Sequence, residues 1–190
     1  MPASWNYPSG PLRSFLKLLL LLALLLPEVS ASSERLAVLE IDSEQASPEP
    51  LLQLSDKLRA GALQAVQARG VEMDIMTRES MAAILSDMGL DVSCVEGQCE
   101  VETARNLRAS LVISGSMIQL EGTWVLTLKL HAAESGRLLA TEEARSNQLL
   151  ALLDQTQERG QTLVQTALSL SRSSASIGAA LSGGEGVPVH

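Results

Sequence analysis

The sequence predicts a mixed α/β domain: a sheet of about five strands with helices packed on at least one face. Two short apolar runs, 36–42 and 71–76, flank a helical pattern at 50–69, which favours a parallel strand pair. Three strand-like segments then follow one another between 110 and 144, which favours an antiparallel meander. The predicted order is β-α-β-α-α-β-β-β-α, and 190 residues suit one such domain.

The first half of the domain alternates strands and helices. Leu36–Asp42 is a short apolar run that ends in an acid, typical of a mostly buried strand. A helix is predicted over Pro50–Arg69, where apolar residues recur every three or four positions, and Gly70 ends it. Val71–Met76 alternates apolar and polar residues and is predicted as the second strand. The helical stripe consists of Leu51, Leu54, Leu58, Ala62 and Val66.

Two shorter helices are predicted next. Thr77 is a favourable N-cap, and Glu79 lies in the first turn, where the helix dipole favours an acid. Gly89 ends this helix, and a third helix is predicted over Glu100–Arg108. The apolar stripe of the helix after Thr77 is Met81, Ile84, Leu85 and Met88.

The second half begins with the meander. Ser110–Leu120 and Thr123–Ala132 are predicted strands joined by a turn at Glu121-Gly122, and Arg137–Ala144 is the third strand. The middle strand has one apolar and one polar face, so the polar face is expected to be partly solvated or to dock a partner. The polar side comprises Val125, Thr127, Lys129 and His131.

A last helix is predicted over Asn147–Leu170. Gly160 lies on its apolar side and is expected to mark a close approach to the sheet. Core packing is the main use expected for its apolar stripe, with self-association as an alternative. Residues 171–190 are rich in Ser and Gly and are predicted to form a flexible tail.

Residues 1–31 have the pattern of a secretory signal peptide. Arg13 and Lys17 precede an apolar run of nine residues, Leu18–Leu26, and small residues end at Ala31. Cleavage is predicted between Ala31 and Ser32, which places the product in the periplasm or outside the cell. A permanent membrane anchor is the alternative, but about twenty apolar residues are needed to span a bilayer. No stable membrane span is expected after processing.

The composition excludes some partners. The chain has a net charge of −8 and only 2% aromatic residues, with Trp124 the only aromatic after Phe15. Nucleic-acid binding needs clustered basic residues and stacking rings, so no nucleic-acid partner is predicted. No cofactor is predicted either.

Cys94 and Cys99 form a Cys-x4-Cys pair in a predicted loop. In an exported protein a disulfide is the natural interpretation. A redox-active pair is an alternative, although such pairs more often have the spacing Cys-x-x-Cys. A zinc site would need two further ligands, and His131 and His190 are the only histidines.

Other candidate residues have simple structural interpretations. His131 is expected to be a solvated surface residue rather than a catalytic base, and no nucleophile-elbow motif accompanies it. The segment Ser114-Gly115-Ser116 lies within a predicted strand, where Gly115 indicates a bulge or close packing against a helix. No phosphate-loop, dinucleotide-binding or zinc-protease motif occurs.

Two groups of acidic residues are candidate ligand sites. Asp42 and Glu44 follow the first strand, at the edge where open α/β sheets bind ligands. A small-ligand or metal site there is one hypothesis, and a solvated loop is the other. The acids around the cysteine loop lack the pattern of a calcium loop and are expected to form a solvated face. They are Glu96, Glu100 and Glu102.

Several segments resemble a family of small α/β envelope domains. The segments are 36–39, 104–116, 124–130 and 135–140, within a resemblance that covers Arg35–Leu170. The family comprises the amino-terminal domain of TolB, CsgG-like curli-secretion proteins and the penicillin-binding-protein activator LpoB. The resemblance implies a non-catalytic periplasmic module that binds other envelope proteins.

The chain also departs from that family. It has no lipid-attachment Cys after its apolar run, and Arg108 stands where the family often has Gly. No propeller or pore-forming insertion follows the domain, so those activities are not implied. The main hypothesis is an exported protein-binding or envelope-assembly module. The alternatives are an envelope enzyme with an unrecognised site and a thiol-redox sensor that uses the Cys pair.

Overall fold

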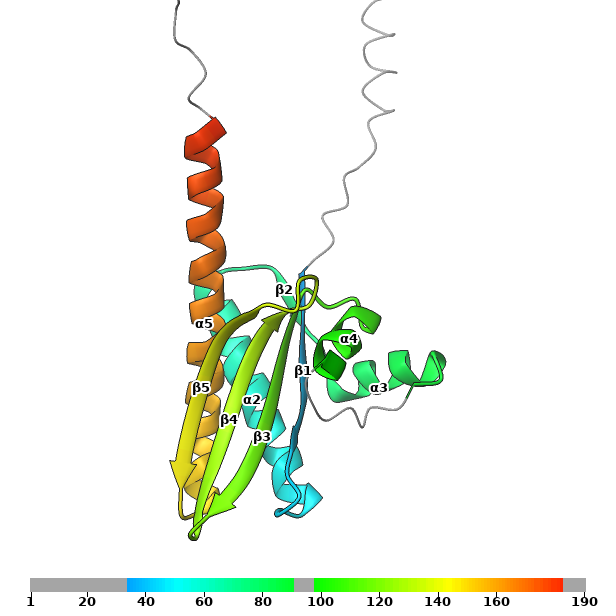
Figure 1. Cartoon of the computed structure of the whole chain (residues 1–190), viewed down its shortest axis with the longest axis vertical. Coiled ribbons are helices and arrows are strands. Elements are labelled where there is room, and N and C mark those ends of the chain that lie inside the picture. The colour runs from blue at the N-terminus through cyan, green and yellow to red at the C-terminus, as the bar shows by residue number, and fades with distance from the viewer. Residues whose placement is uncertain (1–33, 91–97, 183–190) are drawn as a thin grey trace, which may run out of the picture. The chain divides into compact units, whose positions relative to one another are not determined.

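The computed structural model describes residues 34–90 and 98–182 (Figure 1). The chain divides into two units, and the described residues all belong to the second, Ser33–His190. The predicted signal peptide and its cleavage point at Ala31 and Ser32 lie outside the described residues. They remain predictions.

The five strands form one mixed sheet in the order β2-β1-β3-β4-β5. β1 pairs in parallel with both β2 and β3, and the last three strands form an antiparallel meander. The predicted fold class and element order are therefore confirmed. The strands are β1 (Glu34–Asp42), β2 (Met73–Ile75), β3 (Leu111–Leu120), β4 (Thr123–Ala132) and β5 (Leu138–Ser146); the helices are α2 (Pro48–Arg69), α3 (Arg78–Asp87), α4 (Gln98–Asn106) and α5 (Leu149–Ser182).

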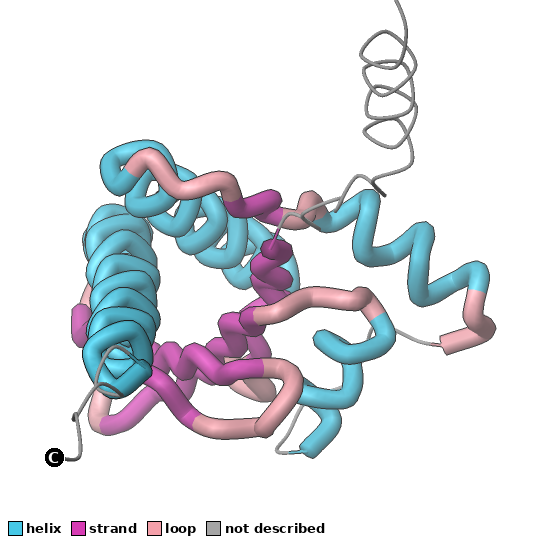
Figure 2. The backbone as a smooth tube through the Cα atoms, turned by 90° about the horizontal axis from the view of Figure 1, so that it is seen from above, coloured by secondary structure: helices cyan, strands magenta, loops and turns pink. Residues whose placement is uncertain are grey.

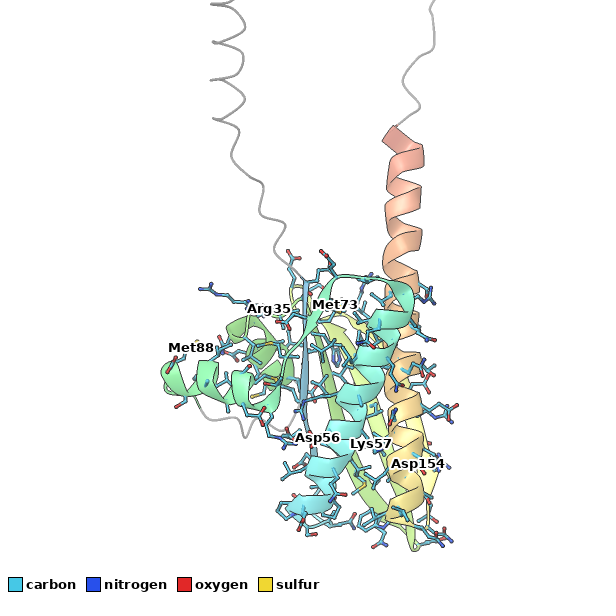
Figure 3. The ribbon with its side chains drawn as sticks, turned by 180° about the vertical axis from the view of Figure 1, so that it is seen from behind. Arg35, Asp56, Lys57, Met73, Met88 and Asp154 are labelled. Carbon is cyan, nitrogen blue, oxygen red and sulfur yellow. The ribbon has the colours of Figure 1, made fainter. Side chains whose placement is uncertain are left out.

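The helices cover the two faces of the sheet unequally. α2 and α5 lie side by side on one face, here called the helix face, where they bury the larger core (Figures 1 and 3). α3 and α4 pack on the opposite face, beside β1 and β3 (Figure 2). There they bury a smaller core that includes Ala37, Leu39 and Val112. Most of that second face on β4 and β5 has no helix over it among the described residues, and we call it the open face.

Two glycines set the distance between α2 and α5. A Cβ on Gly160 would lie 2.8 Å from Cδ1 and 2.9 Å from the carbonyl oxygen of Leu58, and a Cβ on Gly61 would collide with the backbone of Gln157. Gly160 was expected to approach the sheet, and that expectation is wrong. The close approach is between two helices, because small residues on both let the backbones come together.

The expectation for Gly115 was partly right. The β1–β3 register shifts between Val38 and Ile41, so the irregularity lies in β1, opposite Gly115. A Cβ on Gly115 would lie 2.8 Å from Cγ1 of Ile41 and 3.0 Å from Cδ2 of Leu128. The tight packing is therefore against neighbouring strands rather than a helix.

The largest difference in element bounds concerns α5. The helix continues to Ser182, beyond the predicted end at Leu170. Once a helix is established, each further residue adds one hydrogen bond, so a polar segment without Pro can prolong it. The apolar stripe alone could not show this, because it reports the face that packs and not the length of the helix.

Candidate functional site

One end of the described domain gathers exposed apolar side chains. β1 and β3 end there, the β3–β4 hairpin turns there, and α2 and α5 begin there (Figure 1). The pairing of Trp124 with Ser146 brings the end of β5 to the same place. We call this region the hairpin end, and its exposed large apolar residues are Leu52, Ile118, Leu120 and Leu150.

A groove of about 340 Å³ lies between the first turns of α2 and α5 at the hairpin end. Leu54 is almost fully buried in it, whereas Leu150 is 76% exposed at its side. A groove with an exposed apolar rim is typical of protein or ligand docking sites. Its lining residues are Ser47, Glu49, Pro50, Gln53, Leu54, Leu149, Leu150 and Leu153.

The sequence of α5 explains this exposure. Leu149 and Leu153 pack against the larger core, and Leu152 is fully buried. Leu150 is left facing outward because four leucines in the first five helical residues exceed what one buried stripe can hold. Half-buried Trp124, which packs at the edge of the same core, is the only aromatic residue in the described ranges.

The charged residues at the hairpin end are mainly acidic. Asp42 ends β1, Glu44 follows it, Glu49 lies in the first turn of α2, and Glu121 is in the β3–β4 turn. Asp42 is half-buried and Glu44 is exposed. Across the described residues no three His, Cys, Asp or Glu side chains are grouped to hold a metal ion. We call the four acids at this end, Asp42, Glu44, Glu49 and Glu121, the acidic rim; of these, Glu49 lines the groove.

A cluster of charged side chains joins β1, α2 and α3, away from the groove. Glu40 Oε1 accepts hydrogen bonds from Arg59 Nη2 at 2.6 Å and from Arg78 Nε at 2.8 Å. The same Arg59 nitrogen donates to the Val38 carbonyl at 2.8 Å. Asp56 accepts from both arginines, at 2.9 Å and 3.0 Å (Figure 3 labels Asp56).

The electrostatics of this cluster favour ionised Glu40. Burial alone would raise the pKa of Glu40, but the hydrogen bonds from Arg78 and Arg59 outweigh burial and hold that pKa below its ordinary value. The hydrogen bond to Glu40 raises the pKa of Arg78 in turn. The cluster fixes the start of α3 against α2, and because its charges are mutually paired we assign it a structural role.

His131 lies in a different environment from the one expected. Its side chain is only 14% exposed and its Nδ1 lies 3.8 Å from Oε2 of Glu100, which is 12% exposed. The expectations that His131 and Glu100 are solvated are therefore wrong, because α4 packs over this end of β4. His131 Nδ1 has no hydrogen-bond partner among the described residues. At 3.8 Å the two side chains do not form a hydrogen bond with each other in this structure.

The remaining candidate residues are placed as follows. Cys99 lies in α4, but Cys94 and Glu96 lie outside the described residues, so the disulfide remains a prediction. Ser114-Gly115-Ser116 lies within β3 as expected. Within the described ranges no helix has both the length and the apolar character of a membrane span.

Sequence reasoning missed the groove between α2 and α5. Its signal was present in Leu149-Leu150-Ala151-Leu152-Leu153, which is apolar around the whole first turn and a half of the last helix. The buried stripe of a helix uses only some of these leucines, so the remaining ones indicated an exposed apolar surface. The second wall of the groove, in the first turn of α2, could not be assigned to the same site from sequence.

No family model matches the chain, and none of the curated proteins matches it in sequence. Among solved structures, the LpoB C-terminal domain from Salmonella enterica is 14% identical, with a TM-score of 0.44 over 68% of this chain and 93% of that one. Lipoprotein GNA1162 from Neisseria meningitidis is 11% identical, with a TM-score of 0.48 over 64% and 91%. TolB from Acinetobacter baumannii is 8% identical, with a TM-score of 0.44 over 70% of this chain and 27% of that one.

These similarities concern the fold alone. LpoB and TolB are also among the proteins that the sequence resemblance names.

Proposed function

We propose that this chain is a non-catalytic, exported module that binds another protein of the cell envelope through its hairpin end. The observation that carries the proposal is the groove between α2 and α5, with Leu150 76% exposed beside it. The predicted signal peptide supports a location in the periplasm or outside the cell. The family resemblance supports a binding role rather than catalysis.

The groove has the size and chemistry for an apolar side chain of a partner protein. Leucines and Pro50 supply its apolar lining, and Ser47, Glu49 and Gln53 are the polar residues beside them. The exposed side chains of Ile118 and Leu120 lie on the open face, which is the other side of the sheet. Burying such a surface stabilises a complex through the hydrophobic effect, and a few central side chains dominate the binding free energy.

The acidic rim defines the partner further. Glu49 lines the groove, and Asp42, Glu44 and Glu121 lie at the same end of the domain. A partner that suits this surface presents an amphipathic segment, with apolar side chains for the groove and Lys or Arg around them. The charges would guide encounter and orientation more than they would add affinity.

A photo-reactive residue at position 150 tests the site inside cells that express the whole chain. The same residue at position 63 is the matched control, because Leu63 is also an exposed leucine on a helix but lies beyond the hairpin end. We expect one reproducible protein adduct from position 150 and none from position 63. Equal capture from both positions would contradict the proposal.

Binding to the purified captured protein supplies the second measurement. We expect Leu150→Asp to weaken the complex about tenfold or more, since it removes a central apolar contact and adds an unpaired charge. Leu63→Asp should leave the dissociation constant unchanged. An affinity that is insensitive to Leu150→Asp would place the binding surface elsewhere and overturn this assignment.

A further inference from the structure

β5 is the outer strand of the sheet, and its outward side pairs with no other strand of the described residues. The two-residue turn at Glu121-Gly122 makes Leu120 and Thr123 a hydrogen-bonded pair. Along an antiparallel ladder, hydrogen-bonded pairs alternate with pairs whose backbone groups point away from each other. By this alternation Leu126 directs its backbone groups to β5, where Ala144 is its partner. Glu143 and Arg145 therefore direct their N–H and C=O groups away from the sheet.

A side-chain contact agrees with this assignment. The Arg145 carbonyl accepts a hydrogen bond from Nε2 of Gln155, at 3.3 Å, instead of from a strand. That bond is long, and a carbonyl oxygen has a second lone pair. The outer edge of β5 therefore offers backbone donors and acceptors to an incoming strand.

The charges on this edge are self-complementary. Glu143 and Arg145 flank Ala144 and pair with Thr127 and Val125 of β4, so both side chains lie on the open face. Their side chains are 44% and 68% exposed, and they form an ion pair with each other at 2.6 Å. A strand with one acid and one base placed symmetrically about a central residue can match an antiparallel copy of itself.

We propose that two copies of this chain pair antiparallel through their β5 strands, centred on Ala144. Glu143 of each copy then lies opposite the partner's Arg145. Both residues direct their backbone groups outward, so each such pair exchanges two backbone hydrogen bonds. The two-fold symmetry of the dimer produces this Glu143–Arg145 pairing twice, as an interface between two identical surfaces requires.

The charges select this register over its neighbours. Hydrogen bonding allows shifts of two residues, because only every second residue directs its backbone outward. Centring the pair on Glu143 places two glutamates opposite each other, and centring it on Arg145 places two arginines opposite each other. Like charges directly opposite on adjacent strands are destabilising. Among these registers, only the one centred on Ala144 gives opposite charges at both positions.

The pairing involves a short stretch of one strand, so the interface is small. Small interfaces form weak or transient complexes, and we expect a dissociation constant in roughly the micromolar range. The ion pairs are solvent-exposed on the open face, so added salt should weaken the dimer.

Sedimentation equilibrium of protein purified from cells that express the whole chain tests the proposal. We expect Glu143→Arg alone and Arg145→Glu alone each to weaken self-association about tenfold or more, because each variant faces its own copy with like charges. Asp154→Arg is the matched control: it makes the same charge change at an exposed position on α5 and should leave the dimer unchanged (Figure 3 labels Asp154).

A mixture of the two variants distinguishes a disrupted dimer interface from a structural defect within each chain. Both variants lose the internal Glu143–Arg145 ion pair, so a structural defect would persist in the mixture. We expect an equimolar mixture to form a heterodimer, because each Arg of the first variant then lies opposite a Glu of the second. A wild type that stays monomeric up to about 0.5 mM overturns the proposal, as does undiminished dimerisation of either variant or a mixture that remains monomeric.

Discussion

Replacing Glu40 with Gln should destabilise the fold because Glu40 connects three elements. Its carboxylate accepts from Arg59 at 2.6 Å and from Arg78 at 2.8 Å, and the Arg59 and Glu40 side chains are only 12% and 29% exposed. Gln keeps the shape and one acceptor oxygen but removes the charge. Arg59 retains its bond to the Val38 carbonyl and its ion pair with Asp56, so the arginine loses one of its two ionic partners.

The magnitude follows from the change in hydrogen-bond type. A hydrogen bond that involves a charged group contributes about 1.5–3 kcal/mol. In Glu40→Gln both arginine donors stay charged, so each bond loses only the charge of its acceptor and is weakened rather than made neutral. Two bonds each weakened by about 1 kcal/mol give a loss of about 2 kcal/mol in the free energy of unfolding at pH 7. For a domain of this size that corresponds to a fall of about 4–8 °C in Tm.

The effect should depend on pH with a defined sign. Because the pKa of Glu40 is lower in the folded state, its carboxylate stabilises the fold above the unfolded pKa. That contribution fades as the pH falls below 4.5 and through the lower folded pKa. The difference between wild type and Glu40→Gln should therefore be largest near neutral pH and shrink in acid.

Urea unfolding followed by circular dichroism at several pH values measures this difference. Asp74→Asn is the matched control, since the Arg35–Asp74 pair is 3.8 Å apart and both side chains are well exposed. It should cost less than about 0.5 kcal/mol. A Glu40→Gln effect that is equally small at pH 7, or that is undiminished in acid, would refute the reasoning.

Two further predictions concern packing and a buried hydroxyl. Ser55 Oγ accepts a hydrogen bond from the Ile41 N–H at 2.9 Å and donates one to the Leu51 carbonyl. Ser55→Ala leaves the buried N–H unpaired, so it should lower the free energy of unfolding by about 1–3 kcal/mol in urea unfolding. A Ser55→Ala chain as stable as wild type would contradict this. Gly61→Ala should destabilise by about 1–3 kcal/mol in thermal unfolding, despite Ala's higher helix propensity, because its Cβ meets immobile backbone of α5. A rise in Tm would show that the helices separate without cost.

Most of the fold could be predicted because the strand and helix signals are local. Period-two patterns identified the meander, and the turn at Glu121-Gly122 is where expected, with positive φ at both residues. Thr77 caps α3 as predicted, accepting from the Ser80 N–H. The position of Gly160 against α2 could not be predicted, because a glycine on an apolar face does not reveal which element approaches it.

Contacts between distant segments, including those that form the candidate site, were less predictable. Glu40 and Arg78 are separated by 38 positions in the sequence, and neither has a local pattern that indicates the other. His131 and Glu100 meet only because α4 folds over β4, whereas each looked solvated by its own segment. The hypothesis of a small-ligand or metal site at Asp42 and Glu44 stays a prediction. The apolar groove at the same end of the domain depends on how α2 and α5 pack.

The two proposed surfaces follow from the lengths of the connections around β5. Only Asn147 and Gln148 separate β5 from α5, so the chain must turn at once onto the helix face. It therefore leaves the outer edge of β5 uncovered. α3 and α4 lie between β2 and β3 in the sequence and pack beside β1, far from that edge. Among the described residues no strand pairs with the outer edge of β5, and Leu150 stays 76% exposed. The charge pattern of the edge suits a second copy of this chain, whereas the apolar groove suits a different partner.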